Sequence, residues 1–374
     1  MKPTHTFILL LAFLTTFTGC GSAGKESLQS ANDMEYASFI TMSGDDEGEL
    51  FFRIGNPWKT GKILRTYRIG NDVKTGFSIT ERECDIHTPV TRAVVMTNSH
   101  ARLLSELGLA ESIAGVCESE YITDTIVRNA IASGRIRDCG NSMRPDIERI
   151  ISLNPDAIFV SPFEETGYGQ LEKLGIPLIE CADYMESSPL GRAEWMRFYG
   201  RLFNEGTKSD SLFDFIRNSY LELKDKADSF REKPTVMLDT KAGSAWYVAG
   251  GGSTIGQMIA DAGGEYIFKD RSESGSVPLS FETVYEKANE ADIWLMKNSG
   301  DAEMTYESLK RDYASYEKFK PFRQKRIWVC DVYQTPYFEM TSFHPEILLR
   351  EFIAIFHDEN DTERKMTFYH PMEE

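Results

Sequence analysis

The side chains that could bind a metal ion or act in catalysis are spread thinly along the sequence. None of the histidines forms the H-x-H or H-E-x-x-H pattern that brings zinc ligands together. There is no G-x-S-x-G motif for a nucleophilic serine, and Gly250-Gly251-Gly252 lacks the lysine and hydroxyl residue of a phosphate-binding loop. We therefore expect a protein that is not an enzyme, with no metal site and no cofactor of its own.

The cysteines indicate neither a metal-thiolate cluster nor a disulfide scaffold. Six cysteines in a chain of 42.5 kDa are sparse, and none has the C-x-x-C spacing. After Cys20, either one disulfide, such as Cys117 with Cys139, or a set of buried free thiols fits the pattern, and we favour the free thiols. The cysteines concerned are Cys84, Cys117, Cys139, Cys181 and Cys330.

The first twenty residues have the pattern of a secretory signal. A positive residue precedes a short apolar core that ends at Phe17, and small residues follow before Cys20. The segment resembles a bacterial lipoprotein signal, with Phe17 in place of the usual leucine. We expect residues 1–19 to be a signal peptide, Cys20 to be lipidated and residues 20–35 to be a tether, so that the protein is anchored to a membrane in the periplasm.

The composition is that of a folded and acidic chain. Of 374 residues, 41% are hydrophobic and 26% are charged, which is ordinary for a globular protein. The 58 acidic residues outnumber the 41 basic ones, and the resulting net charge of −17 disfavours binding to nucleic acids. No stretch after residue 20 is long and apolar enough to span a bilayer as a helix.

The order of the predicted elements divides the chain into two similar halves. From residue 91 onward, short apolar strands alternate with helices, which is typical of parallel sheets covered on both faces. A long apolar face from Ser209 predicts a bridging helix of roughly 30 Å. The expected fold class is α/β: two α/β lobes with mostly parallel sheets joined by a single long helix, plus a β-rich N-terminal extension. The predicted boundaries are 36–90 for the extension, 91–208 for the first lobe, 209–232 for the helix, 233–358 for the second lobe and 359–374 for a tail.

Short motifs between residues 91 and 358 carry a resemblance to a known family. The chain resembles the solute-binding proteins of ABC importers that carry iron–siderophore complexes, haem or cobalamin. In that family one long helix bridges two α/β lobes, and the resemblance implies a permease with its ATPase as the partner. The matching pieces, in the family's order, are Ser99–Gly108, Gly140–Glu148, Ile150–Asp156, Leu174–Pro177, Trp246–Val248, Ser253–Gly264, Ser280–Glu282, Ala291-Asp292 and His344–His357.

Two carboxylates occupy corresponding places in the two halves. Glu148 lies in the first turns of a predicted helix after Pro145, and Glu282 follows the capping residue Ser280 by two positions. The resemblance implies that each carboxylate docks its lobe onto arginines of the permease, where bidentate pairing would fix the orientation. The alternative is that each acid only stabilises a helix N-terminus, by about 0.3–1 kcal/mol.

The expected ligand site lies between the lobes, where the carboxyl ends of parallel strands and their loops converge. Aromatic side chains there would stack on a large planar or macrocyclic ligand, and two arginines would pair with its acidic groups. The alternative is that the aromatic residues belong to the core, and we expect this for about half of the set. The candidates are Tyr121, Ser142, Met143, Arg144, Phe163, Trp246, Tyr247, Arg271, Tyr333 and Tyr337.

Together these features favour a lipid-anchored receptor that captures an iron chelate (a siderophore complex or haem) or cobalamin and delivers it to a permease. One alternative is a scavenging lipoprotein that acts without a permease, and another is an enzyme that acts on a chelate. Iron or cobalt would arrive inside an organic ligand, and a histidine axial to haem also remains open.

The bridging helix should limit lobe closure, because a continuous helix cannot absorb the backbone changes of a loop hinge. We expect a monomer that binds no nucleic acid.

Overall fold

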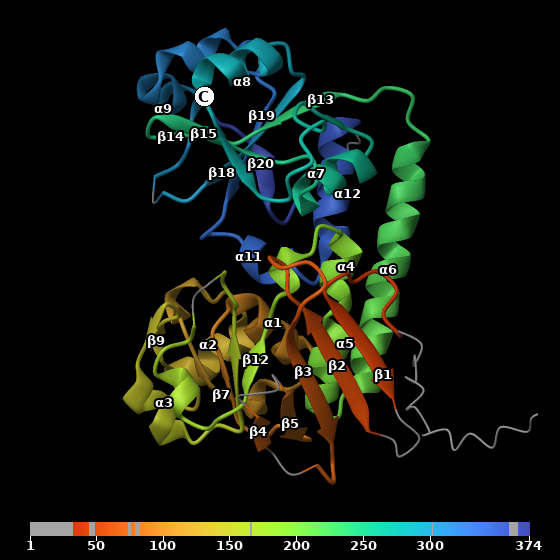
Figure 1. Ribbon diagram of the computed structural model, residues 1–374. Coiled ribbons are helices and arrows are strands. Elements are labelled where there is room, and N and C mark those ends of the chain that lie inside the picture. The colour runs from red at the N-terminus through yellow and green to blue at the C-terminus, as the bar shows by residue number, and fades with distance from the viewer. Residues whose placement is uncertain are drawn as a thin grey trace, which may run out of the picture. The chain divides into compact units, whose positions relative to one another are not determined.

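The computed structural model describes residues 33–44, 49–73, 76–78, 83–164, 167–300, 302–358 and 366–374, all within one compact unit that begins at Asn32 (Figure 1). The predicted signal peptide at 1–19 and Cys20 lie outside the described residues, and the predicted tether is described only from residue 33. No helix in the described part of the chain combines the length and the apolar character needed to cross a bilayer.

The first lobe is built on a parallel sheet in the order β12-β11-β6-β7-β8. Its central strands are short runs of buried apolar residues, the pattern expected where helices cover both faces. The strands are β6 (Ala93–Val95), β7 (Ile113–Val116), β8 (Arg137–Asp138), β11 (Ala157–Val160) and β12 (Leu178–Glu180). The helices between them are α1 (Asn98–Glu106), α2 (Thr125–Ala132) and α3 (Ile147–Leu153), and the side chains of Asp124 and Asp146 cap the last two.

The second lobe repeats this plan with a sheet in the order β16-β13-β18-β19-β20 and a smaller antiparallel sheet beside it. The main strands are β13 (Thr235–Leu238), β16 (Glu265–Tyr266), β18 (Ile293–Asn298), β19 (Ile327–Asp331) and β20 (Tyr369–Pro371), and the smaller sheet contains β14 (Lys241–Ala242), β15 (Ala245–Ala249) and β17 (Ser276–Leu279). The helices include α7 (Thr254–Asp261), α8 (Phe281–Ala288), α9 (Tyr306–Asp312), α10 (Lys320–Arg323) and α12 (Pro345–Phe356).

The C-terminal residues belong to the second lobe and do not form the separate tail that the sequence predicted for 359–374. Strand β20 pairs antiparallel with β19, and the Met372 N–H donates to the Ile327 carbonyl. Phe368 and Tyr369 are buried in the core of this lobe. The chain end therefore completes the edge of the sheet.

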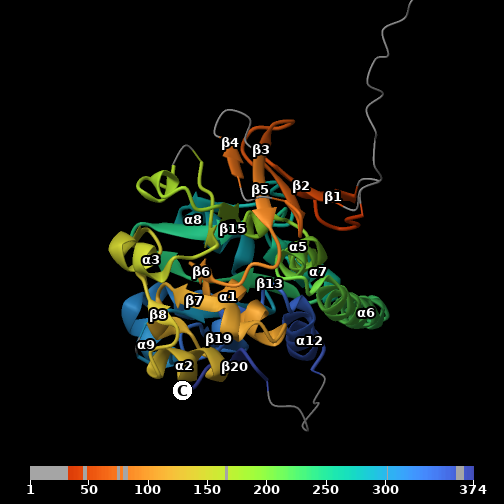
Figure 2. The same cartoon turned by 90° about the horizontal axis from the view of Figure 1, so that it is seen from below.

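Helix α6 (Gly206–Asp228) joins the two lobes, as the sequence predicted, although it begins and ends a few residues before the predicted span of 209–232. Phe213 and Ile216 of this helix are buried in the core of the first lobe, and Tyr220 and Ala227 in the core of the second. It packs on α5 (Met196–Leu202) and on α12, and Figures 1 and 2 show α6 and α12 side by side. Because one helix contributes to both cores, it fixes the distance between them.

The β-rich N-terminal extension forms a mixed sheet in the order β1-β2-β3-β5-β4, on one flank of the molecule (Figure 2). Tyr67 and Phe52 pack on Phe198 of α5. The Tyr67 hydroxyl also donates to the Leu178 carbonyl and accepts the Glu180 N–H, both at 2.8 Å, so it satisfies the free edge of β12. The strands are β1 (Ile40–Gly44), β2 (Leu50–Gly55), β3 (Ile63–Gly70), β4 (Gly76–Ser78) and β5 (Glu83–His87).

Two carboxylates hold the backbone that leads into this extension. Glu194, at the end of α4 (Pro189–Glu194), accepts the N–H groups of residues 35, 36 and 37. Glu186 accepts those of residues 38 and 39 and the indole N–H of Trp195. Burial raises the pKa of Glu186, and these donors oppose that effect. Five successive backbone N–H groups are thus satisfied by two side chains.

The lobes are also joined by the segment around α11 (Tyr337–Met340). Helix α11 packs on α1, and Phe343 is buried in the core of the first lobe. The Glu339 carboxylate accepts the backbone N–H and the hydroxyl of Thr123, and His344 lies 2.7 Å from Glu106. The lobes are therefore connected at a point distant in sequence from α6.

Candidate functional site

A cavity of about 550 Å³ opens on the first lobe at the carboxyl ends of β6 and β11. Four of the predicted ligand residues line this cavity: Ser142, Met143, Arg144 and Phe163. The other walls are mostly apolar and include Met96, Val160, Tyr168 and Leu171. These side chains lie at the carboxyl ends of parallel strands, and all residues that line the cavity belong to the first lobe, whereas the sequence predicted a site between the lobes.

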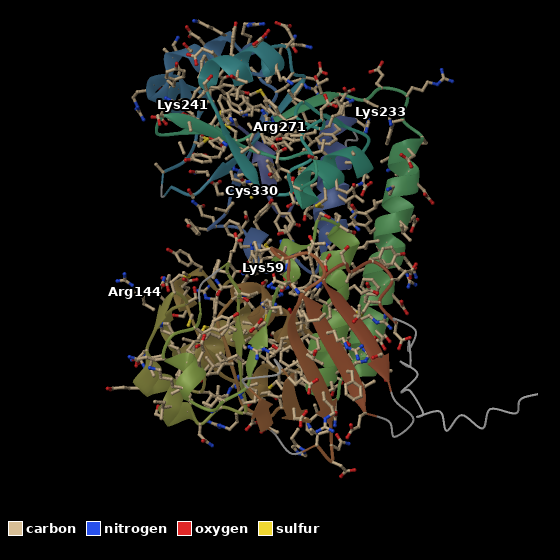
Figure 3. All side chains as sticks on the ribbon, in the orientation of Figure 1. Lys59, Arg144, Lys233, Lys241, Arg271 and Cys330 are labelled. Atoms are coloured by element: carbon tan, nitrogen blue, oxygen red, sulfur yellow. The ribbon has the colours of Figure 1, made fainter. Side chains whose placement is uncertain are left out.

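A tight hairpin presents Met143 and Arg144 to this cavity. The hairpin joins β9 (Gly140–Asn141) to β10 (Arg144–Pro145), and the Asn141 side chain accepts the Met143 N–H at 2.9 Å. Asn141 and Ser142 also donate to the Glu118 carboxylate at 2.9 and 3.0 Å. These hydrogen bonds hold the turn in place. The Met143 side chain is 65% exposed, and Arg144 extends outward from the lobe (Figure 3).

A smaller pocket of about 160 Å³ adjoins the cavity and shares three residues with it: Thr97, Ser161 and Phe163. Its remaining lining comprises Ser99, His100, Cys181, Asp183, Tyr184 and Arg192. Asp183 follows the carboxyl end of β12, so the pocket lies at the same edge of the sheet as the larger cavity. The two hollows adjoin at these shared residues, and both are lined by described residues of the first lobe.

His100 and Asp183 form a buried ion pair beneath this pocket. His100 Nε2 lies 3.0 Å from Asp183 Oδ1, which also accepts the Tyr199 hydroxyl at 3.0 Å. Burial alone would lower the pKa of His100, but the contacts with Cys181 and Asp183 raise it to about 10. Burial would likewise raise the pKa of Asp183, and His100 holds it below its ordinary value. At neutral pH both side chains are therefore charged.

Arg192 of α4 faces the same carboxylate from the other side. Its Nε lies 3.5 Å from Asp183 Oδ2 and has no hydrogen-bond partner among the described residues. Sequence reasoning missed both Arg192 and Asp183. Nothing in the local pattern separates Arg192 from any other helical arginine, whereas the position of Asp183 after the end of β12 is a signal that could have identified it.

On the second lobe, two of the predicted ligand residues are core residues instead. Trp246 is fully buried, donates its indole N–H to the Leu238 carbonyl at 3.1 Å and stacks on Trp294, so its prediction as a ligand residue is wrong. Tyr337 is 9% exposed and packs against Phe368, which also places it in the core. In a strand, neighbouring side chains point to opposite faces, so burial of Trp246 turns the next residue outward.

The other second-lobe candidates are more accessible. Tyr247 is half exposed, and Arg271 lies 3.5 Å from Glu273 within the second lobe (Figure 3). Neither lines the cavities described above. Tyr333 stacks on Tyr121 of the first lobe, with ring centroids 4.6 Å apart, so these two predicted ligand residues contact each other across the lobes. Both residues remain partly exposed to solvent.

The predicted docking carboxylates, Glu148 and Glu282, are both exposed. Each lies in the first turn of its helix, α3 or α8, after a capping side chain, Asp146 or Ser280. Neither makes an ion pair with the residues that the structure describes. The position fits both interpretations, because an acid in the first turn stabilises the helix and an unpaired carboxylate is also available to a partner.

All five cysteines in the described ranges are buried and free, including Cys117 and Cys139, so the structure contains no disulfide between them. The described residues also contain no group of three or more histidine, cysteine or acidic side chains that is placed to hold a metal ion. The groups that line the candidate site are instead suited to apolar contact, hydrogen bonding and charge pairing with an organic ligand.

The chain belongs to the periplasmic binding protein family, whose sequence model matches residues 94–333. Its relatives include an uncharacterized lipoprotein of Methanocaldococcus jannaschii, which is 28% identical over 76% of this chain and 69% of that protein. A cobalamin-binding protein of Halobacterium salinarum is 24% identical over 57% of each chain.

Solved structures share the fold. The periplasmic haem-binding protein RhuT from Roseiflexus is 22% identical, and the match covers 72% of this chain and 98% of that one with a TM-score of 0.57. The family match begins just after the N-terminal sheet, so β1 to β5 lie outside it. Two α/β lobes bridged by α6 are therefore the shared architecture, and the extension is an addition to it.

Proposed function

We propose that this protein is an extracytoplasmic solute receptor of an ABC importer, and that it binds an iron chelate (a siderophore complex or haem) or cobalamin between its lobes. The ligand would then pass to a permease driven by its ATPase. We further propose that the protein is a monomer anchored in the periplasm through a lipid on Cys20.

The observation that carries the proposal is the pair of adjoining cavities on the first lobe, which would form the first lobe's share of a site between the lobes. A cavity of about 550 Å³ falls within the range of small-molecule sites, and it combines exposed apolar side chains, Met143 and Phe163, with the cation Arg144. Exposed apolar side chains that gather in one hollow are typical of a ligand-binding groove. A large, partly apolar ligand with acidic or polar groups suits this lining.

The family membership supports the same conclusion, because its members are binding proteins. The exposed carboxylates Glu148 and Glu282, one on each lobe, support delivery to a partner. A scavenging lipoprotein would use the same ligand site but would not need these two carboxylates.

Ligand binding is tested by titrating the purified chain with cobalamin, haemin and a panel of ferric siderophores while following tryptophan fluorescence. We expect saturable quenching by one of these ligands and recovery of that ligand unchanged by mass spectrometry. Met143→Ala combined with Phe163→Ala should weaken the binding at least tenfold. Absence of binding by every ligand would refute the proposal, and chemical alteration of the ligand would indicate an enzyme.

A further inference from the structure

The N-terminal extension contains a hairpin that connects β2 to β3, and its tip comprises residues 56–62. This tip lies well before residue 94, where the family match begins, so it is an addition to the shared two-lobe architecture. Its sequence, Asn-Pro-Trp-Lys-Thr-Gly-Lys, contains an indole and two lysines and no acidic residue. Trp58 is partly exposed, and Lys59 and Lys62 are exposed.

Hydrogen bonds within the hairpin tip fix its conformation. The Asn56 side chain accepts the N–H groups of Trp58 and Lys59 at 3.0 and 2.9 Å. The Asn56 N–H donates to the Lys62 carbonyl at 2.8 Å, and the Lys62 N–H donates to the Lys59 carbonyl at 3.0 Å. Gly61 has a φ of +72°, a left-handed conformation that favours glycine. The tip is therefore a preorganised turn, which lowers the entropic cost of any contact that it makes.

Contacts with β12 show which edge of the first lobe the hairpin passes. The Tyr67 hydroxyl bonds the backbone of β12, and Arg65, two residues nearer the tip, pairs with Glu180 at 2.8 Å. Glu180 is the last residue of β12, and the next residue, Cys181, lines the smaller pocket. At about 3.3 Å per residue, Lys62 lies about 10 Å beyond Arg65 along the strand. The tip thus extends past the edge of the sheet at which the two cavities open.

The base of the hairpin tip lies beside the junction of the two lobes. The Gly55 N–H donates to the Phe39 carbonyl at 2.8 Å, and the Phe39 N–H donates to the Glu186 carboxylate. The Glu186 carbonyl in turn accepts the hydroxyl of Thr254 in the second lobe, also at 2.8 Å. Figure 3 shows Lys59 at the height at which the two lobes face each other. The tip therefore flanks the space between the lobes on the side where the N-terminal sheet lies.

We propose that the hairpin tip is a third wall of the ligand site, and that Trp58 and Lys59 contact a part of the bound ligand that the two lobes leave uncovered. This inference rests on the proposed function and extends it: the ligand projects from between the lobes toward the N-terminal sheet and presents a flat or apolar surface there. An indole packs well on such a surface, and the stem of a lysine covers apolar area while its ammonium stays in water.

The contact is tested by equilibrium dialysis of cobalamin, haemin and a panel of ferric siderophores, which does not depend on tryptophan fluorescence. The proteins compared are the wild type, the double variant Trp58→Ala with Lys59→Ala, and the control Asp72→Ala, which changes an exposed residue just beyond the opposite end of β3. The double variant should bind the ligand of the wild type about threefold to tenfold more weakly, and the control should bind it equally well.

A second measurement uses the unaltered chain, so it does not depend on how a variant folds. Lysines are acetylated with a limiting amount of reagent, with and without saturating ligand, and the products are quantified by mass spectrometry. Bound ligand should slow the labelling of Lys59 at least threefold and leave the labelling of Lys310, an exposed lysine of α9, unchanged.

The outcomes separate this inference from the proposed function. A wild type that binds one of these ligands, with equal affinity in the double variant or equal labelling of Lys59 in both states, would overturn the third wall and leave the proposed function standing. Loss of uptake by the double variant with unchanged affinity would assign the tip to the permease and would also overturn it. A wild type that binds none of the ligands would overturn both.

Discussion

His344 and Glu106 join the two lobes through a hydrogen bond of 2.7 Å between Nε2 of the imidazole and Oε2 of the carboxylate. The other ring nitrogen of His344 lies 3.1 Å from Glu346 at the start of α12, and Arg102 donates to Glu106 at 2.6 Å. Together with α6, this cluster connects the lobes at two places. The strength of the hydrogen bonds in this cluster depends on the charge of the His344 imidazole.

The free energy of unfolding should therefore depend on pH through His344. Burial would lower the pKa of His344, but the hydrogen bonds to Glu106 and Glu346 raise it to about 9. A raised pKa in the folded state means that this stabilisation is complete below about pH 6.5 and is lost as the pH rises through 9. The contribution is at most about 3 kcal/mol.

Chemical denaturation of the wild type and of His344→Gln between pH 6 and pH 10 measures this effect. The wild type should lose stability with rising pH by more than the variant. His100, whose pKa is also raised, contributes the same trend to both proteins and cancels in the comparison. Parallel curves for the two proteins would show that His344 does not carry the charge assigned to it.

Trp246 and Tyr247 provide a matched test of which face of β15 is buried. Trp246→Ala removes a fully buried indole and should lower the free energy of unfolding by about 3–5 kcal/mol. Tyr247→Ala changes a half-exposed side chain and should stay within about 0.5 kcal/mol of the wild type. Denaturant titration of both variants decides the point, and similar losses would contradict the assignment of Trp246 to the core.

Tyr67→Phe tests whether the N-terminal sheet supports the first lobe. The substitution removes the hydroxyl that bonds Leu178 and Glu180 at the edge of β12 and leaves two backbone groups unsatisfied. We expect a loss of about 1–3 kcal/mol in the free energy of unfolding, with a single cooperative transition. Tyr247→Phe, on an exposed tyrosine, should have no measurable effect. A Tyr67→Phe variant as stable as the wild type would mean that the extension contributes little to the lobe.

Charge reversal of Glu148 and Glu282 separates delivery from scavenging. If the two carboxylates dock the lobes on a permease, Glu148→Lys with Glu282→Lys should abolish ligand uptake by cells or permease vesicles while ligand binding stays unchanged. Glu286→Lys, an exposed position on the same helix as Glu282, is the control and should leave uptake intact. Normal uptake by the double variant would favour the scavenging alternative.

The distance between the lobes should change little when ligand binds. Helix α6 has residues in both cores, and α11 and His344 connect the lobes elsewhere, so a wide hinge motion would have to break buried contacts. Small-angle X-ray scattering with and without the bound ligand should give nearly the same radius of gyration. A marked compaction on binding would show that α6 and the α11–His344 segment do not prevent the lobes from closing.

The sequence predicted the architecture well because the α/β pattern is local. Runs such as Ala93–Val95 and Ala157–Val160 are apolar throughout, as strands buried on both faces must be, and α6 shows its apolar face at helical spacing. The C-terminal strand β20 escaped detection because its pairing partner β19 lies about forty residues earlier, and a single short strand has no signal of its own.

Four of the predicted ligand residues lie together on the first lobe. Ser142, Met143, Arg144 and Phe163 follow strand ends and come together there. Trp246 was placed wrongly because the run Trp-Tyr-Val has apolar side chains on both faces of β15, so the alternation does not reveal which face is inward. Arg192 was missed because only the folded chain brings its guanidinium near Asp183.

Glu186 and Glu194 recognise the peptide backbone at residues 35–39 and not its side chains. The amino acids at these five positions can therefore vary without losing these hydrogen bonds, as long as each retains an amide hydrogen, while Tyr36, Ala37 and Phe39 also pack on the cores through their side chains. Proline is the one residue type that lacks this hydrogen. Homologues with an equivalent pair of acids should therefore vary in sequence at the positions that correspond to residues 35–39, but should not have proline there.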